Sequence, residues 1–178
     1  MSMAIYLPFP NNLELTMEVL DDKSLVKQTK DIILIFEEIL KYKQEKSYLD
    51  APVVEIYKDD LNFVATYGLV CINEYKYRFG KVLSGGGGIL DYCNSHGITE
   101  EVQCSFVPCY LSKGHKAKKD GCDLLFQGEL VEKWVTAKKE PKWTKRDVPE
   151  FFQRYVNADR DVQEMYWRVN LKMRGEGK

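Results

Sequence analysis

One long stretch of helical periodicity constrains the fold of this chain more than any other feature. From Asp22 to about Lys46, apolar or small side chains recur at the three- and four-residue spacing of an α-helix. Asp21 and Asp22 precede them and lysines follow, which suits the dipole of a helix in this direction. A helix with one long apolar stripe needs other elements to cover that stripe. The residues of the stripe are Leu25, Thr29, Ile32, Ile33, Phe36, Ile39 and Leu40.

Shorter helix signals flank this stretch on both sides. Before it, residues 13–20 are predicted to form a helix with Asn12 as its N-cap. After it, Pro52 is suited to the first turn of a helix, and apolar periodicity then runs on towards Gly80, a residue that often ends helices. The acidic pair at Asp59 predicts a break, so two helices are expected between Pro52 and Gly80.

The second half of the chain also favours helices, and strand-like alternation is nearly absent. Four glycines at 85–88 are expected to form a flexible joint, and Gly97 is expected to end the helix that follows. Further helices are predicted near residues 89–95, 122–137, 149–155 and 159–173. The predicted fold is therefore all-α, a compact helical bundle of one domain over residues 1–178, with an irregular insert at 81–121.

Composition narrows the class of protein. The chain has 178 residues, enough for one ordinary domain, and 30% of them are charged. The longest apolar run, residues 32–36, is far shorter than a membrane span, and the opening residues do not resemble a secretory signal. Five cysteines form an odd set and suggest reduced thiols. The expectation is a soluble, cytoplasmic protein without membrane contact.

Charge is distributed unevenly along the chain. Residues 1–112 carry 10 basic and 16 acidic side chains, whereas residues 113–178 carry 16 basic and 11 acidic ones. The stretch from Lys113 to Arg146 is the most basic part, and a polyanion is a candidate partner for it. A solvated surface is the competing interpretation.

Few motifs point to a known type of catalytic or metal site. The glycine run lacks the Lys-Ser/Thr pair of a phosphate-binding loop, and the sequences typical of serine hydrolases and zinc proteases are absent. Thiols and imidazoles do gather between residues 93 and 122, but without paired C-x-x-C spacing. No metal or cofactor is therefore predicted, and buried cysteines are the alternative to a zinc site at Cys93, His96, Cys104 and Cys109.

Three segments in order carry a family resemblance: IYLPFP at 5–10, VLDDKSLVKQTKD at 19–31 and INEYKYRFG at 72–80. With the Pro-led helix between them, residues 4–80 resemble the pyrimidine-dimer DNA glycosylases of the endonuclease V type. The resemblance implies a helical fold, residues 1–80 as the glycosylase-like core, and double-stranded DNA as the partner. The charge count and the helix signals make residues 113–178 the basic C-terminal helices. It also implies removal of a damaged base, followed by strand cleavage at the abasic site.

The resemblance further implies roles for particular residues. The nucleophile of such enzymes is the α-amino group of residue 2, which corresponds to Ser2 once Met1 is removed. The glutamate that these enzymes carry early in the long helix falls near Ser24 here, so Asp31 is the carboxylate expected to replace it, with Asp21 or Asp22 as alternatives and Glu74 as a second catalytic residue. The expected DNA contacts are Lys23, Lys27, Gln28, Arg78 and, in a loop that loosely matches the family, Lys113, His115 and Lys116.

Two other functions stay open at this point. The replaced glutamate favours a non-catalytic nucleic-acid- or protein-binding module on the same scaffold, such as a phage accessory protein. The thiols and imidazoles between residues 93 and 122 favour a zinc-stabilised interaction protein. Trapping of an imine with borohydride separates the first alternative from an amine-using enzyme, and metal analysis tests the second.

Overall fold

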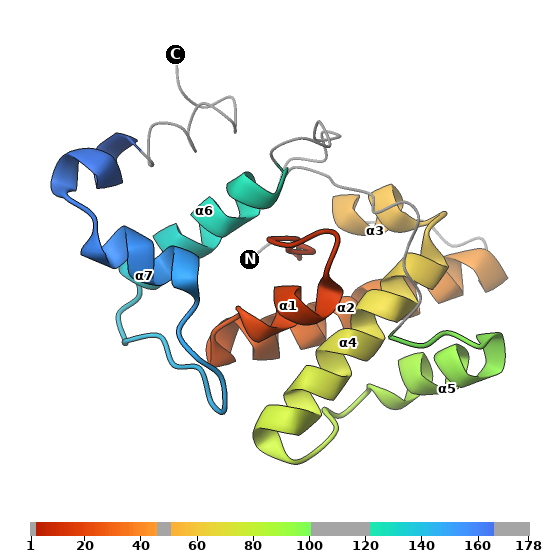
Figure 1. Cartoon of the computed structure of the whole chain (residues 1–178). Helices are drawn as coiled ribbons and strands as arrows, with labels where there is room; N and C mark the ends of the chain where they lie inside the picture. Colours follow the sequence, from red (N-terminus) through yellow and green to blue (C-terminus); the bar gives the residue numbers. More distant parts are fainter. Residues whose placement is uncertain (1–2, 46–50, 101–121, 166–178) are drawn as a thin grey trace.

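The structure of the protein is a computed structural model, and it describes residues 3–45, 51–100 and 122–165. Over these ranges the chain forms helices and no strand, which confirms the all-α prediction (Figure 1). Residues 160–165 are helical as well. The named helices are α1 (Leu13–Glu18), α2 (Asp22–Glu45), α3 (Pro52–Tyr57), α4 (Leu61–Phe79), α5 (Gly87–His96), α6 (Cys122–Val135) and α7 (Glu150–Asn157).

The ends of these helices follow the local signals. The side-chain oxygen of Asn12 accepts a hydrogen bond from the Leu15 amide at 3.0 Å and so caps α1. The predicted break near Asp59 separates α3 from α4. Gly80 and Gly97 adopt left-handed backbone angles, with φ of 73° and 64°, directly after α4 and α5.

The four-glycine joint is shorter than predicted. Gly85 has the positive φ of 91° that favours glycine, whereas Gly87 and Gly88 are already the first residues of α5. The predicted insert at 81–121 is thus partly helical. Its remaining residues, 101–121, and most of the predicted helix at 159–173 lie outside the described residues.

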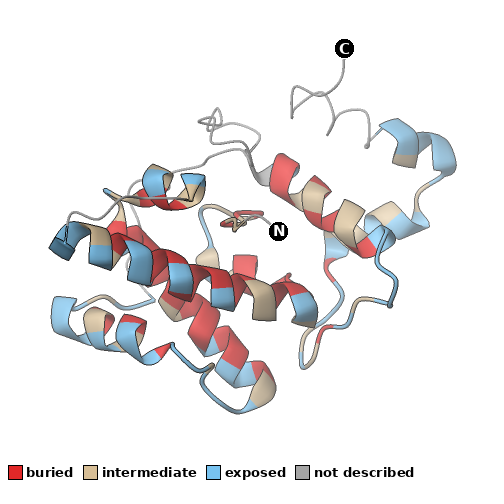
Figure 2. Ribbon diagram, turned by 180° about the vertical axis from the view of Figure 1, so that it is seen from behind, coloured by how far each residue is buried: buried red, intermediate tan, exposed pale blue. Residues whose placement is uncertain are grey.

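The core lies where α2 packs against α4, with α1, α3 and α5 around this pair (Figures 1 and 2). In Figure 2, buried residues line the faces that these helices turn towards one another. Gly68 allows α5 to approach α4, because a Cβ atom there would lie 2.7 Å from the Cδ1 atom of Ile89. Fully buried members of the core include Leu25, Ile32, Ile35, Phe36, Ile39, Val64, Tyr67 and Ile89.

The C-terminal part of the chain packs on the N-terminal part. The amide of Asp22 donates to the carbonyl of Lys142 at 2.7 Å, and the indole of Trp143 donates to the carbonyl of Val19 at 2.9 Å. Thr144 donates to the Asp22 carboxylate through both its amide and its hydroxyl. The segment 142–144 therefore closes the corner between α1 and α2. In the described ranges, none of the helices combines the length and apolar character that crossing a bilayer requires.

Candidate functional site

The N-terminal segment, residues 3–8, lies in an extended conformation over α2 and is held there by side chains. The amide oxygen of Gln28 accepts from the Tyr6 amide at 3.0 Å, and its nitrogen donates to the Ala4 carbonyl at 2.8 Å. From α4, the hydroxyl of the buried Tyr67 donates to the Tyr6 carbonyl at 2.7 Å. Gln28 therefore anchors the chain end, whereas the sequence suggested that it contacts DNA.

Helix α6 covers the same segment from the other side. The amide nitrogen of Gln127 donates to the Pro8 carbonyl at 3.0 Å, and the ring of Phe126 meets that of Tyr6 edge to face, with centroids 6.0 Å apart. The start of the chain is thus enclosed by α2, α4 and α6. Ser2, the expected nucleophile, lies outside the described residues.

Charged side chains of α2 lie beside this segment. Lys27 and Asp31, one turn apart, form an ion pair, and Asp31 is only 8% exposed. Lys23 is exposed one turn before Lys27. The expected catalytic carboxylate and the two expected phosphate-binding lysines therefore belong to neighbouring turns of one helix. They flank Gln28, which holds the N-terminal segment.

Helix α6 adds a third lysine to this surface. Lys133 is half-buried, and its ammonium lies 5.9 Å from the centroid of the Tyr6 ring. Burial lowers the pKa of Lys133, and the positive charges of Lys27 and Lys23 lower it further, while Asp21 and Asp31 act in the opposite direction. The net pKa of Lys133 lies below its ordinary value. We call Lys23, Lys27 and Lys133 the three-lysine surface.

Asp21 has a structural role next to this surface. One of its carboxylate oxygens accepts from the Ser24 amide at 3.2 Å, which caps α2, and from the indole of Trp134 at 2.8 Å. The hydroxyl of Ser24, where the sequence resemblance expected a glutamate nearby, is buried and has no hydrogen-bond partner among the described residues. Asp21 thereby fastens α6 to the first turn of α2.

Arg78 is fully buried and uses every N–H of its guanidinium within the protein. It donates to Glu74 at 2.7 Å, to Asp22 at 3.1 Å, and to three backbone carbonyls at 2.7–3.1 Å. The carbonyls belong to the C-terminal end of α1 and the turn after it, at Met17, Glu18 and Leu20. With no donor left for a phosphate, Arg78 belongs to the framework and does not match the DNA contact expected from the sequence.

Glu74 is enclosed by two arginines. Arg146 donates to its two carboxylate oxygens at 3.0 and 2.8 Å, and Arg78 binds the first of these oxygens as well. Burial alone would raise the pKa of Glu74, but the hydrogen bonds from Arg146 and Arg78 outweigh it, so that pKa lies below its ordinary value. A carboxylate held ionised in this way serves the structure, and nothing in its contacts indicates proton transfer.

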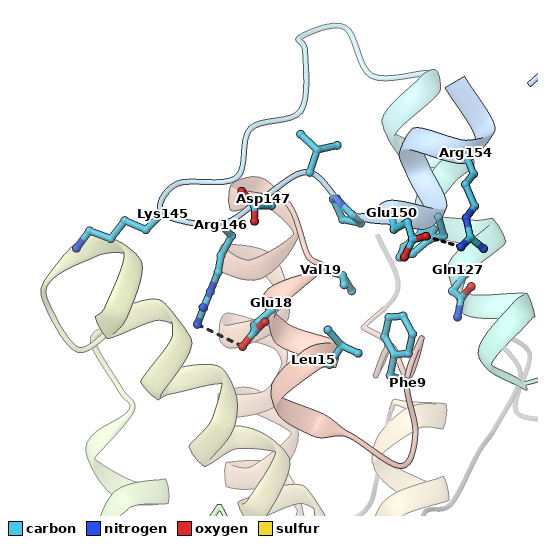
Figure 3. Close-up of a pocket in the computed structure, with 13 residues that line it drawn as sticks. Phe9, Leu15, Glu18, Val19, Gln127, Lys145, Arg146, Asp147, Glu150 and Arg154 are labelled. Atoms are coloured by element: carbon cyan, nitrogen blue, oxygen red, sulfur yellow. Dashed lines mark hydrogen bonds and ion pairs between the residues drawn. The ribbon is translucent and has the colours of Figure 1, made fainter. Parts of the chain in front are cut away.

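A cleft of about 860 Å³ opens between the N-terminal segment, α1 and α7 (Figure 3). The rings of Phe9 and Phe151 form part of its wall, with centroids 6.2 Å apart. Its arginines are already paired, Arg146 with Glu18 at 3.6 Å and Arg154 with Glu150. The lining charges of this cleft therefore largely balance one another, in contrast to the three-lysine surface.

The remaining predicted site residues are only partly covered by the structure. Lys113, His115 and Lys116 lie outside the described residues, as do Cys104 and Cys109. Of the zinc candidates, Cys93 is buried with its thiol 3.6 Å from the Ala65 carbonyl, while His96 is exposed and stacks on Tyr92. Within the described ranges, no group of three potential metal ligands comes together.

Sequence reasoning missed several residues that shape the site. Lys133 lies in the basic stretch 113–146, but nothing in its spacing separates it from the other lysines there. From the C-terminal part of the chain, Trp134 and Trp143 reach the region between α1 and α2, and Arg146 reaches Glu74 on α4. The sequence signal that could have found them is the presence of two tryptophans within the basic stretch 113–146.

Residues 3–82 match the family model described as pyrimidine dimer DNA glycosylase. The match covers the N-terminal part of the chain and confirms the resemblance seen in residues 4–80. No curated protein and no solved structure matches the chain.

Proposed function

We propose that this protein is a DNA glycosylase that removes a damaged base from double-stranded DNA, with the α-amine of Ser2 as nucleophile. The observation that carries the proposal is the anchoring of the N-terminal segment by Gln28, whose neighbours on α2 are Lys27 and Asp31. The family matched by residues 3–82 supports the same reaction class. Removal of Met1 is part of the proposal, and a small residue at position 2 is compatible with it.

The reaction proceeds in two stages in this proposal. The neutral α-amine attacks the anomeric carbon of the damaged nucleotide, the glycosidic C–N bond breaks, and its electron pair leaves with the base, which takes up a proton. Opening of the sugar ring and loss of the amine proton leave an imine. Removal of a proton from the adjacent sugar carbon then expels the 3′ phosphate and cleaves the strand. An α-amine suits the first step because its pKa, near ~8, leaves an appreciable neutral fraction at physiological pH.

We assign to the carboxylate of Asp31 the stabilisation of the sugar cation and the transfer of protons. Its charge stabilises the cationic sugar and accepts protons, and its ion pair with Lys27 holds it one turn from Gln28, which binds the N-terminal segment. Lys23 and Lys27 bind the phosphates that flank the damaged nucleotide. Glu74 has no part in this scheme because both of its oxygens are bound by arginines.

Imine trapping tests the proposal directly. The protein is incubated with duplexes that carry an abasic site or a thymine dimer, with and without borohydride. We expect a covalent adduct that disappears when the N-terminus is extended by extra residues. Asp31→Asn should lower the rate of adduct formation about 100-fold or more, while Glu37→Gln, an exposed carboxylate on the same helix, should leave it unchanged. An adduct that survives the extension contradicts the role of Ser2.

A non-catalytic DNA-binding module is the second candidate function. The observation that favours it is Ser24, which lies near the place where the resemblance expects an early glutamate, because its buried hydroxyl has no hydrogen-bond partner among the described residues. This candidate predicts binding that weakens with salt but no adduct with any of the duplexes. The same trapping experiment, with DNA binding measured in parallel, decides between the two.

A further inference from the structure

Lys133 comes from the part of the chain beyond the family match, yet it faces the start of α2. The neighbouring indole of Trp134 donates to Asp21 at 2.8 Å, just before the first turn of α2. The Lys133 ammonium itself lies 5.9 Å from the centroid of the Tyr6 ring, and the backbone of Tyr6 is bound by Gln28. These contacts place Lys133 over the first two turns of α2, next to Lys23 and Lys27.

The carboxylates of Asp21 and Asp31, which both act on the charge of Lys133, are bound by other groups. The carboxylate of Asp31 is paired with Lys27, and that of Asp21 is bound by the Ser24 amide and the Trp134 indole. In the part of the chain that the structure describes, no carboxylate lies within ion-pair distance of the Lys133 ammonium. A half-buried ammonium near two like charges is unfavourable unless an anion joins it.

We propose that Lys133 completes, together with Lys23 and Lys27, a binding site for a backbone phosphate diester of DNA. The choice of ligand rests on the proposed function, since DNA is the anion that this surface would meet beside the chain end. Three ammonium groups on two helices suit a phosphate, because its unesterified oxygens accept hydrogen bonds from more than one direction. In this arrangement α6 contributes directly to DNA binding, although it lies outside the segment that matches the family.

The arginines of the cleft in Figure 3 differ from Lys133 because they have carboxylate partners. In the cleft of Figure 3, Arg146 and Arg154 already bind Glu18 and Glu150. A phosphate there would have to displace an existing carboxylate. At Lys133 it would instead supply a counterion that the described residues do not provide.

The test combines DNA binding with stability. Binding of a short duplex that carries a tetrahydrofuran abasic-site analogue is measured over a range of salt concentrations for the wild type, Lys133→Gln, Lys133→Arg and Lys138→Gln. Lys138 is an exposed lysine just after α6 and supplies the matched control. Urea unfolding of each variant is measured in parallel.

Lys133→Gln should raise Kd about five- to tenfold at moderate salt and reduce the slope of log K against log salt by about 0.9, the value for one lost phosphate contact. Lys133→Arg should keep most of the wild-type affinity and most of the wild-type salt slope. Because the native ammonium is partly desolvated and has no carboxylate within ion-pair distance among the described residues, Lys133→Gln should keep or increase resistance to urea. A purely structural role for Lys133 predicts the opposite change in stability.

Three results would overturn the inference. The first is wild-type affinity and salt slope in Lys133→Gln, and the second is an equal loss in Lys138→Gln, which would indicate diffuse attraction. The third is loss of a borohydride adduct in Lys133→Gln together with its persistence in an N-terminally extended protein, which would make Lys133 the imine-forming amine. Absence of any adduct with intact binding would refute the proposed glycosylase and leave the phosphate site standing.

Discussion

Replacement of Gln28 by alanine tests the link between the fold and the proposed chemistry. Gln28 is 1% exposed and makes two hydrogen bonds, to the Tyr6 amide at 3.0 Å and the Ala4 carbonyl at 2.8 Å. Each bond contributes about 1 kcal/mol net, and the backbone groups left behind lose their partners. Because Ile5 and Leu7 of the same segment are core residues, we expect a loss of about 2–3 kcal/mol in the global free energy of unfolding.

Urea unfolding and amide hydrogen exchange measure this effect. The midpoint of urea unfolding should fall by about 1 M, and exchange of the Tyr6 amide should accelerate. Gln44→Ala removes the same kind of side chain from an exposed position on the same helix and should change stability by less than about 0.5 kcal/mol. If the N-terminal amine is the nucleophile, Gln28→Ala should also lose borohydride trapping under conditions where it remains folded. Stability equal to that of the wild type would refute the assignment of Gln28 as the anchor.

Three further predictions follow from the packing and the charges. Glu74→Gln should lower the unfolding free energy by about 2–4 kcal/mol, since it leaves buried guanidinium charge without its counterion, and chemical denaturation measures this. The pKa values of Glu74 and Asp22 are lowered in the folded state, so their ionised forms stabilise the fold. This stabilisation is complete above their unfolded pKa values of 4.5 and 3.8, and it is lost as the pH falls through their folded pKa values. Urea midpoints measured between neutral and acidic pH should show the decline. Gly68→Ala should destabilise the protein by about 1–3 kcal/mol because the new Cβ would meet Ile89. Gly88→Ala should stabilise it by up to about 1 kcal/mol, because this position in α5 has open space around it. Thermal unfolding of the two variants checks the direction of each change in stability.

Local signals predicted the helices well because each of them acts within a few residues. The Asn12 cap, the apolar stripe that begins at Leu25 and the stop at Gly80 are all contained in short windows of sequence. The length of the glycine joint was less predictable, because the packing of Ile89 against Gly68 decides where α5 begins to bury its side chains.

The roles of polar residues were harder to predict because their partners lie far away in the chain. Arg78 looks like a surface arginine paired with Glu74 at helical spacing, yet it donates to three distant carbonyls, those of Met17, Glu18 and Leu20. Gln28 follows Lys27 in a polar pattern, but its partners are the first residues of the chain. Spacing along one helix cannot show which distant backbone group will face a side chain.

The corner between α1 and α2 also has a consequence for shortened forms of the protein. A fragment ending at residue 82, where the family similarity stops, would lose Trp143 and Thr144 and expose the Val19 carbonyl and the Asp22 carboxylate that they bind. It would also leave Asp21 without the indole of Trp134. The unit that folds cooperatively therefore extends beyond residue 82, where the sequence similarity ends. Mutational or binding studies of the N-terminal half require the C-terminal residues to be present.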